Sequence, residues 1–237
     1  AARELFAAGG KRVRFFLPGA WTQCALGSAP AEALDLLRVW SREGDELVAE
    51  SLPAFGLRPW ATHLGPEVLA LLLPWAADPD PEVRRAVVVA LRPRGVWVPH
   101  LEWAVDAPSL LVPLFDALRQ ERELRVASAL GNALNDVGYS HPQLILELLH
   151  RWREEGSGPH VEAVARKGLR SLLKSGDPRA LQALGLPALQ VSLTATLRGG
   201  AEVEPNSNLI FDLEVHNAGA EVPAHLVYEI ETPGKDA

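Results

Sequence analysis

Apolar residues recur at steps of three and four through most of residues 1–186, which is the pattern of amphipathic helices. The clearest runs lie at 31–44, 66–78 and 141–155. Prolines stand near the expected helix starts, where a missing N–H costs nothing: Pro30, Pro66, Pro81 and Pro142. We therefore predict that residues 1–186 are helical almost throughout.

Three of these helical segments align with one another. They are 83–91, 126–134 and 164–172, offset by 43 and 38 residues, and each begins with valine and ends with leucine. Another apolar helix and a short turn precede each segment. A two-helix unit of about 40 residues is typical of HEAT repeats, which stack into a curved solenoid. The sequence therefore predicts a mainly α-helical, HEAT-like superhelical domain over residues 1–186.

The pattern changes after Pro187. Residues 188–200, 208–219 and 225–234 alternate apolar and polar side chains and end in glycine-bearing turns, as strands do. Three strands in about 50 residues resemble the beginning of an immunoglobulin-like sandwich, which needs about seven. We predict that residues 187–237 form a β-rich, partial immunoglobulin-like segment, either truncated or reduced.

Net charge and composition limit the functions that the chain can have. The chain has 23 basic and 30 acidic residues, a net charge of −7, so binding to nucleic acid requires a local basic face. The single cysteine, Cys24, excludes an internal disulfide and fits a reducing compartment. No apolar run approaches the roughly 20 residues of a membrane span, and no basic-then-apolar segment opens the sequence, so we expect no secretory leader. These features together lead us to expect a cytoplasmic protein.

The sequence holds no glycine-rich phosphate loop, no metal-spaced Cys/His cluster and no arguable Ser-His-Asp set, so we expect neither cofactor nor metal. Two groups of basic residues remain. They lie on the aligned segments, which as second helices of successive repeats would line the concave face. The groups are Arg84, Arg85, Arg92 and Arg94, and Arg166, Lys167, Arg170 and Lys174. A polyanion-binding groove and solvated helix ends both explain them.

The middle aligned segment, "SALGNALNDVG" (128–138), is almost uncharged. Its small residues, Ala129, Gly131 and Ala133, would let a ligand approach closely. Asp136 stands near a helix end, where the helix dipole does not favour an anion. It therefore either faces a cation or, with Asn135, caps the turn.

Five of the seven tryptophans can be assigned from the sequence, and the roles of Trp60 and Trp152 stay open. Four lie on apolar helix faces and are predicted to be core residues: Trp21, Trp40, Trp75 and Trp103. Trp97 instead follows a helix end in "RPRGVW" (92–97), beside Arg92 and Arg94. This corner is a candidate binding site.

Four stretches together resemble the AlkC branch of the bacterial DNA alkylation repair glycosylases, whose AlkD relatives share the HEAT scaffold. They are "LRPWATHLGPEVLALLLPWAADPDPEVRR" (57–85), "RPRGVW" (92–97), "ALNDVGYSHP" (133–142) and "KGLRSLLKSGDPRALQALG" (167–185). The match covers most of residues 50–186. The β-rich end fits as well, because AlkC proteins carry an immunoglobulin-like C-terminal domain.

The resemblance implies a function. Family members excise 3-methyladenine and related cationic bases from double-stranded DNA by hydrolysing the N-glycosidic bond without flipping the base, and they use no cofactor. Their catalytic Trp and Asp match Trp97 and Asp136. The arginine of the Arg-Pro-aromatic motif matches Arg58, and we expect it to contact phosphates together with the two basic groups.

The chemistry of that reaction suits these residues. A cationic purine leaves without protonation, so the barrier lies in building positive charge on the deoxyribose. A carboxylate such as Asp136 stabilises that charge and orients water, and an aromatic face such as Trp97 holds a cation by about 1–2 kcal/mol.

The chain departs from the family at two acidic positions, where Ala54 and Val89 replace the usual glutamates. Two functions stay open. One is a DNA glycosylase acting through Trp97 and Asp136. The other is a catalytically impaired HEAT protein that binds damaged or branched DNA, or a protein-interaction scaffold.

Overall fold

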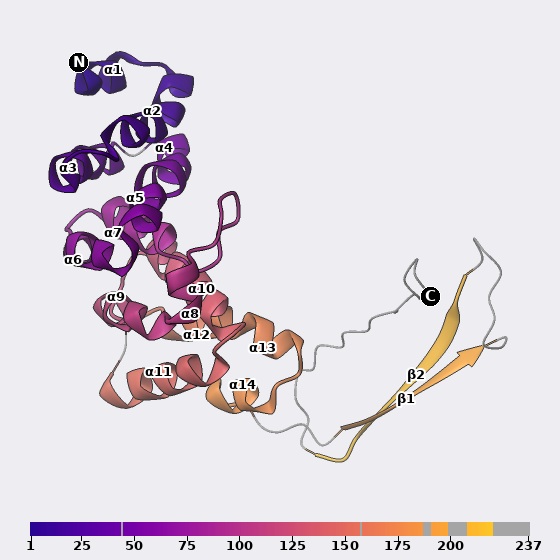
Figure 1. The fold of residues 1–237 in the computed structure, drawn as a ribbon. Helices are drawn as coiled ribbons and strands as arrows, with labels where there is room; N and C mark the ends of the chain where they lie inside the picture. The colour runs from indigo at the N-terminus through magenta and orange to yellow at the C-terminus, as the bar shows by residue number, and fades with distance from the viewer. Residues whose placement is uncertain (44, 157, 187–190, 199–207, 220–237) are drawn as a thin grey trace. The chain divides into compact units, whose positions relative to one another are not determined.

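The computed structural model describes residues 1–43, 45–156, 158–186, 191–198 and 208–219. It divides into two units, Ala1–Leu184 and Gly185–Ala237. The division falls two residues before the boundary expected at 186. The first unit is helical and the described part of the second is a β-sheet (Figure 1).

The first unit begins with short helices that precede the aligned repeats. In chain order these are α1 (Ala2–Ala8), α2 (Lys11–Ala25), α3 (Pro30–Ser41), α4 (Glu46–Ser51), the π-helix η1 (Leu52–Leu57) and α5 (Arg58–Leu64). The element η1 packs on α2 and α4 on one side and on α7 on the other. It therefore joins the N-terminal helices to the repeats.

The repeats continue the same stack. Their elements are η2 (Gly65–Glu67), α6 (Val68–Leu72), η3 (Leu73–Ala77), α7 (Pro81–Ala90), α8 (Glu102–Asp106), η4 (Pro108–Leu111), α9 (Val112–Leu118), α10 (Leu124–Gly138), α11 (Pro142–Glu155), α12 (Val161–Gly168), α13 (Arg170–Lys174) and α14 (Pro178–Ala183). The second helices α7, α10 and α12 pack on one another in succession, and η3 packs on α9. This confirms the two-helix repeat predicted from the aligned segments.

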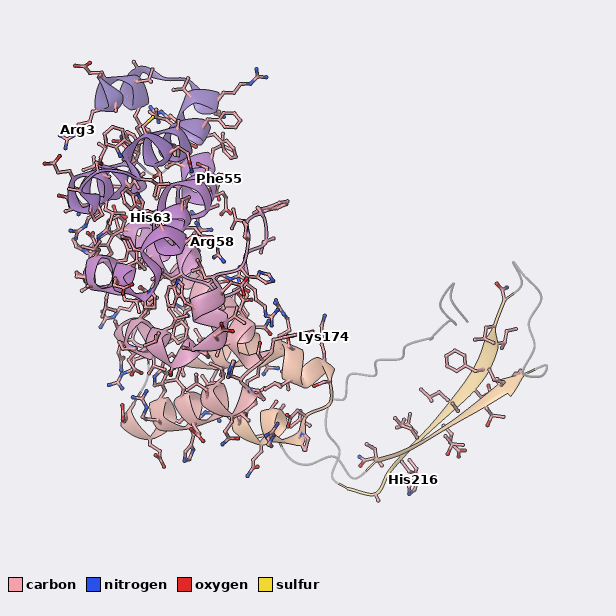
Figure 2. All side chains as sticks on the ribbon, viewed as in Figure 1. Arg3, Phe55, Arg58, His63, Lys174 and His216 are labelled. Carbon is pink, nitrogen blue, oxygen red and sulfur yellow. The ribbon has the colours of Figure 1, made fainter. Side chains whose placement is uncertain are left out.

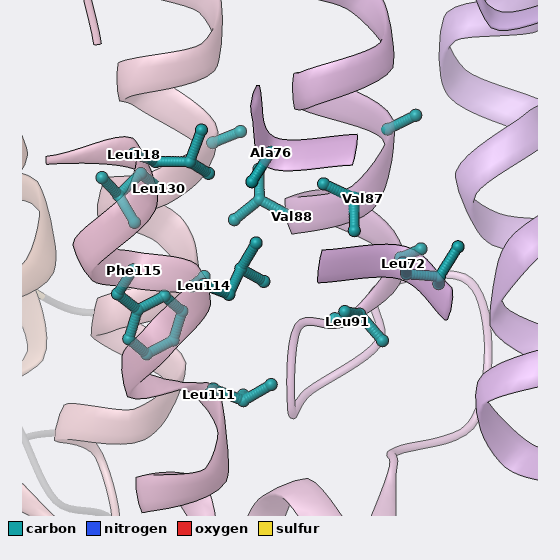
Figure 3. Close-up of a cluster of buried hydrophobic side chains, with 14 of the residues drawn as sticks. Leu72, Ala76, Val87, Val88, Leu91, Leu111, Leu114, Phe115, Leu118 and Leu130 are labelled. Carbon is teal, nitrogen blue, oxygen red and sulfur yellow. The ribbon is translucent and has the colours of Figure 1, made fainter. Parts of the chain in front are cut away.

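The core lies between the two layers of helices. Val87, Val88 and Leu91 of the α7 region lie near Leu114 and Phe115 of α9, all of them buried (Figure 3). The valine and leucine that begin and end each aligned segment are buried in all three repeats: Val83, Val126, Val164, Leu91, Leu134 and Leu172. The repeated apolar columns are therefore core columns.

The helix predicted over 66–78 is not continuous. It breaks into the 3-10 helix η2, one α-helical turn in α6 and the 3-10 helix η3. Pro74 accounts for the change from α6 to η3, because a proline within a helix has no N–H for the carbonyl four residues earlier and crowds it. The segment still buries Val68, Leu72 and Trp75 as the periodicity predicts.

Arginine–carboxylate contacts tie neighbouring repeats together. Arg38 and Arg42 donate to the buried carboxylate of Asp78 at 2.7 and 2.9 Å, from 40 and 36 residues away. Burial alone would raise the pKa of Asp78, but hydrogen bonds from the Asp80 N–H and the two arginines outweigh it and lower the pKa. Each contact spans about one repeat, so it connects adjacent layers of the stack.

The helices α10 and α12 approach each other most closely at two glycines. A Cβ on Gly131 would lie 2.9 Å from Lys167 Cβ, and one on Gly168 would lie 2.9 Å from Leu134 Cβ. Ala129 and Ala133 are buried as well. The prediction that these small residues admit a ligand is wrong, because α12 occupies the space at Gly131 and because Ala129 and Ala133 are buried.

The second unit contains β1 (Val191–Arg198) and β2 (Ile210–Asn217), which pair antiparallel with Val191 opposite Asn217 and Arg198 opposite Ile210. Both match predicted strands. The third predicted strand, 225–234, lies outside the described residues. Within the residues described, this one sheet is not accompanied by a second, so the predicted immunoglobulin-like sandwich is not observed there.

In the described part of the chain, no helix has the length and apolar character needed to cross a membrane.

The glycine contact between α10 and α12 gives a stability prediction. Gly168→Ala should lower the free energy of unfolding by about 1–3 kcal/mol, because its methyl group would overlap Leu134. Gly27→Ala is the control, since nothing lies within 4 Å of its added Cβ, and it should change stability by less than about 0.5 kcal/mol. Urea denaturation measures the free energy of unfolding of both variants. Equal values for Gly168→Ala and Gly27→Ala would show that α10 and α12 can move apart at no cost in stability.

Candidate nucleic-acid interface

The chain between α7 and α8 forms a loop that projects from the helical stack (Figure 1). It carries the sequence "RPRGVW", and its two arms meet where the Leu101 N–H donates to the Pro93 carbonyl at 2.9 Å. We call residues 92–100 the Trp97 loop.

Trp97 is 82 % exposed. All seven tryptophans lie in the described residues, and each of the others is buried or packed against the core: Trp21, Trp40, Trp60, Trp75, Trp103 and Trp152. The predicted core roles therefore fit, with Trp21 and Trp103 only half-buried. An indole left in water adds nothing to the core, so its aromatic face is available to a ligand.

A hollow lies beside Trp97. Its lining includes Arg92, Arg94, Val89 and Ala54, together with Glu50, whose carboxylate is paired with Arg85. The two positions at which the sequence lacks the expected glutamates thus lie next to the exposed indole. Their apolar side chains make this hollow less acidic than the resemblance implies.

Arg92 connects this hollow to Asp136. Its Nε and Nη2 donate to the two carboxylate oxygens of Asp136 at 2.8 and 2.9 Å, and the side chains are 17 % and 7 % exposed. Such a two-bond pair is the strong form of an arginine–carboxylate contact. Asp136 lies in the last turn of α10, where the helix dipole does not favour an anion. The Arg92 guanidinium supplies the positive charge that stabilises the carboxylate there.

The capping alternative for Asp136 is wrong. Its neighbour Asn135 does not cap that turn either, because its side-chain oxygen accepts from the N–H and the hydroxyl of Ser171 on α13, 36 residues away, at 2.9 and 3.0 Å. Asp136 lies on the Arg92 side of the helix, and its carboxylate faces a cation as the other reading predicted.

Positive charge gathers around this pair. Burial, together with the charges of Arg170 and Arg92, lowers the pKa of Lys167, whose ammonium contacts the Ser128 hydroxyl. Three further basic residues are exposed, and no side-chain hydrogen bond or ion pair holds them within the described residues: Arg166, Arg170 and Lys174. They are spaced four residues apart along α12 and α13; Lys174 is labelled in Figure 2.

Besides Arg92, which is paired with Asp136, three of the arginines expected to contact phosphates are engaged inside the protein. Arg58 is 3 % exposed and donates to backbone carbonyls. Arg84 binds both oxygens of Glu121 at 2.7 and 2.8 Å, and Arg85 binds the Ala49 carbonyl at 2.7 Å. The sequence pattern could not separate arginines that join repeats from arginines that face solvent.

Arg94 stays near the surface of the Trp97 loop. Its guanidinium lies 4.4 Å above the Tyr139 ring and donates to the Ser140 hydroxyl at 2.8 Å. Tyr139 is itself 67 % exposed. Sequence reasoning missed Tyr139, although it lies only three residues after Asp136.

An apolar groove of about 760 Å³ adjoins the Trp97 loop. Phe16 and Phe55 line it together with His63 and the loop residues Val98 and Pro99 (Phe55 and His63 in Figure 2). Sequence reasoning missed this groove as well; the adjacent aromatic residues Phe15 and Phe16, of which only Phe16 is exposed, were a signal for it. No cluster of metal-ligating side chains occurs in the described residues.

Comparisons with known proteins bear on the same region. No family model matches the chain. The protein YhaZ of Bacillus subtilis (strain 168) is 31% identical over 135 residues, 57% of this chain and 37% of its own length. Among solved structures, the alkylpurine DNA glycosylase AlkC of Pseudomonas fluorescens, bound to DNA containing an abasic site analogue, has 27% identity and a TM-score of 0.64. The structural match covers 81% of this chain and 52% of the AlkC chain.

AlkD2 of Streptococcus mutans has the same fold at 19% identity, with a TM-score of 0.58 over 71% of this chain and 77% of its own. These similarities confirm the AlkC/AlkD resemblance that the sequence motifs indicate. The chain spans about half of AlkC and less of YhaZ.

The Arg92–Asp136 pair gives a second stability prediction. Asp136→Asn should lower the free energy of unfolding by about 2 kcal/mol, because it leaves a largely buried guanidinium without its counter-charge. Glu162→Gln, which disrupts an exposed pair with Arg153, should change it by less than about 0.5 kcal/mol. Thermal and urea unfolding measure both; no loss in Asp136→Asn would mean that the pair is open in solution.

Proposed function

We propose that this chain, which shares the helical-repeat fold of AlkC and AlkD2, acts in DNA alkylation repair by excising cationic N3-alkylated bases of the 3-methyladenine type from double-stranded DNA. The supporting observation is the similarity to AlkC, which extends over 81% of the chain. That AlkC structure contains an abasic site analogue, and an abasic site is what remains after a base is released. We propose a monomer of the bacterial cytosol or nucleoid that needs no metal or cofactor.

In this proposal Asp136 acts on the sugar. A base that is already cationic leaves without a general acid, and the transition state gathers positive charge on the deoxyribose. Arg92 occupies one acceptor direction on each oxygen of Asp136, and a carboxylate has about four such directions. The remaining directions can orient water and oppose the developing charge.

Trp97 acts on the lesion itself. Its exposed indole lies at the hollow with Arg92 and Arg94, and the face of an indole attracts a cation more strongly than the other aromatic rings do. We propose that Trp97 holds the cationic nucleotide against the helical face while the base stays unflipped.

The exposed basic side chains hold the phosphates. Arg166, Arg170 and Lys174 supply three positive charges on the segment next to Asp136. Contacts to phosphates fix the position of DNA without reading its sequence. They provide the local basic face that a chain of net charge −7 requires.

The apolar residues Ala54 and Val89 make the hollow less acidic, so we expect slow excision. The alternatives, a catalytically impaired DNA-binding protein and a protein-interaction scaffold, are not favoured by the comparisons.

Excision tests the proposal. Asp136→Asn should slow single-turnover release of 3-methyladenine from methylated duplex DNA by about 100-fold, and Trp97→Ala should slow it comparably, since each removes an interaction made with developing charge. Glu162→Gln serves as the control and should behave like the wild-type protein. Rates are compared at a temperature at which every variant is folded. Wild-type release no faster than the spontaneous rate would contradict the proposal.

Salt dependence tests the phosphate contacts. Arg170→Gln should reduce the slope of the logarithm of the binding constant against the logarithm of salt concentration by about 0.9, the value for one lost phosphate contact. Arg179→Gln is the control, because Arg179 is paired with Asp177 on α14. An unchanged slope for Arg170→Gln would place the DNA elsewhere.

A further inference from the structure

Arg58 has a set of hydrogen bonds in which every partner is a backbone carbonyl. Its Nε donates to Pro99 at 2.9 Å, its Nη1 to Ala90 and Arg92 at 3.1 and 2.8 Å, and its Nη2 to Pro93 at 3.3 Å. The residue is 3 % exposed (Figure 2). No carboxylate neutralises it directly, so its donors serve the main chain alone.

Three of the four carbonyls belong to the two arms of the Trp97 loop, and the fourth lies at the end of the preceding helix. Ala90 ends α7, where helix carbonyls lack partners of their own. Arg92 and Pro93 lie on the outgoing arm, and Pro99 lies on the returning arm. The loop has few other bonds between its arms, because prolines donate nothing. The Leu101 N–H donates to the Pro93 carbonyl at 2.9 Å, and the Gly95 N–H donates to the His100 ring at 3.2 Å. The four bonds of Arg58 are therefore a large part of what holds the base of the loop together.

We propose that Arg58 is a positioning residue, which holds the Trp97 loop and the main chain of Arg92 in the geometry that presents Trp97 and Asp136 to DNA. The structural part of this inference stands on the hydrogen bonds alone. Its effect on excision rests on the proposed function.

Electrostatics support this role over a direct contact with phosphate. Burial and the neighbouring charge of Arg92 lower the pKa of Arg58 to about 10, and only the more distant charge of Asp136 acts in the opposite direction. A guanidinium exposed to phosphates would not be desolvated in this way. A cation in such a place is retained for its planar array of donors, which fits several fixed acceptors at once.

The hydrogen bonds of Arg58 affect the candidate site in two ways. Arg58 fixes the carbonyl of Arg92, whose side chain holds Asp136. It also fixes the base of the loop at Pro93 and Pro99, with Trp97 between them. Loosening the base displaces Trp97 without removing any group that would contact DNA.

The test compares Arg58→Lys with Arg84→Lys. Lysine keeps the charge but cannot span carbonyls on both arms. Arg84 is the matched control, because it too is largely buried and donates to two carbonyls, Asp78 and Pro79, at 2.8 and 3.0 Å, at the opposite end of α7. Arg58→Gln, which carries no charge to bury, is the second variant. Sucrose keeps all three folded where needed, and helical circular dichroism verifies this.

The first readout is limited trypsin cleavage after Arg94, at the Arg94–Gly95 bond in the loop, followed by mass spectrometry. We expect at least a tenfold faster cut in Arg58→Lys and Arg58→Gln, and less than a twofold change in Arg84→Lys. Wild-type cleavage rates in both Arg58 variants would overturn the proposal. Equal acceleration in Arg84→Lys would also overturn it, since the loss would then be general.

The second readout separates this inference from the proposed function. In Arg58→Lys we expect at least tenfold slower single-turnover release of 3-methyladenine, with affinity for an abasic-site-analogue duplex reduced less than fivefold. A large loss of affinity with an unchanged rate would restore Arg58 as a DNA contact and overturn the proposal. Faster cleavage in the Arg58 variants, with no release by the wild-type protein, would refute the proposed function and leave Arg58 as the support of the loop.

Discussion

The structure depends on polar contacts that recur at the length of a repeat. A helical pair cannot bury its apolar face alone, so each layer must dock on the next. Asp78 receives Arg38 and Arg42, Glu121 receives Arg84, and the separations of 36 to 40 residues equal about one repeat. These partners are charged and partly or fully buried, so they fix how neighbouring layers align, in addition to the apolar contacts.

The Arg92–Asp136 pair is another arginine–carboxylate contact between repeats, but its position in the fold differs from that of the others. It spans 44 residues and joins α7 to α10 as the others join their layers. Yet it lies at the end of α7, where the chain leaves the stack as the Trp97 loop, and basic residues of α12 and α13 surround it. The same kind of contact that aligns repeats therefore places a carboxylate beside an exposed indole. The candidate site uses the architecture of the repeat and adds a loop to it.

The sequence predicted the repeat well, because burial repeats with the chain: Val83, Val126 and Val164 share one column and are all buried. It predicted Trp97 and Asp136 through motif resemblance. It could not predict which arginines point outward, since Arg85 and Arg166 occupy the same column of the aligned segments, yet of these two side chains only Arg85 is bonded within the described part of the protein. Whether either finds a carboxylate or carbonyl depends on a residue about 40 positions away. Arg58 illustrates this most clearly, because its acceptors are main-chain atoms that carry no signature in the sequence.

The central claim is that one face, formed by the Trp97 loop and by α12 and α13, receives damaged DNA. Hydrogen exchange of the whole chain, with and without a duplex containing an abasic site analogue, tests it most directly. The account predicts slower amide exchange in residues 92–100 and 161–174, and weaker protection with an undamaged duplex. Protection confined to the opposite layer, in α9 and α11, or equal protection by both duplexes, would contradict it.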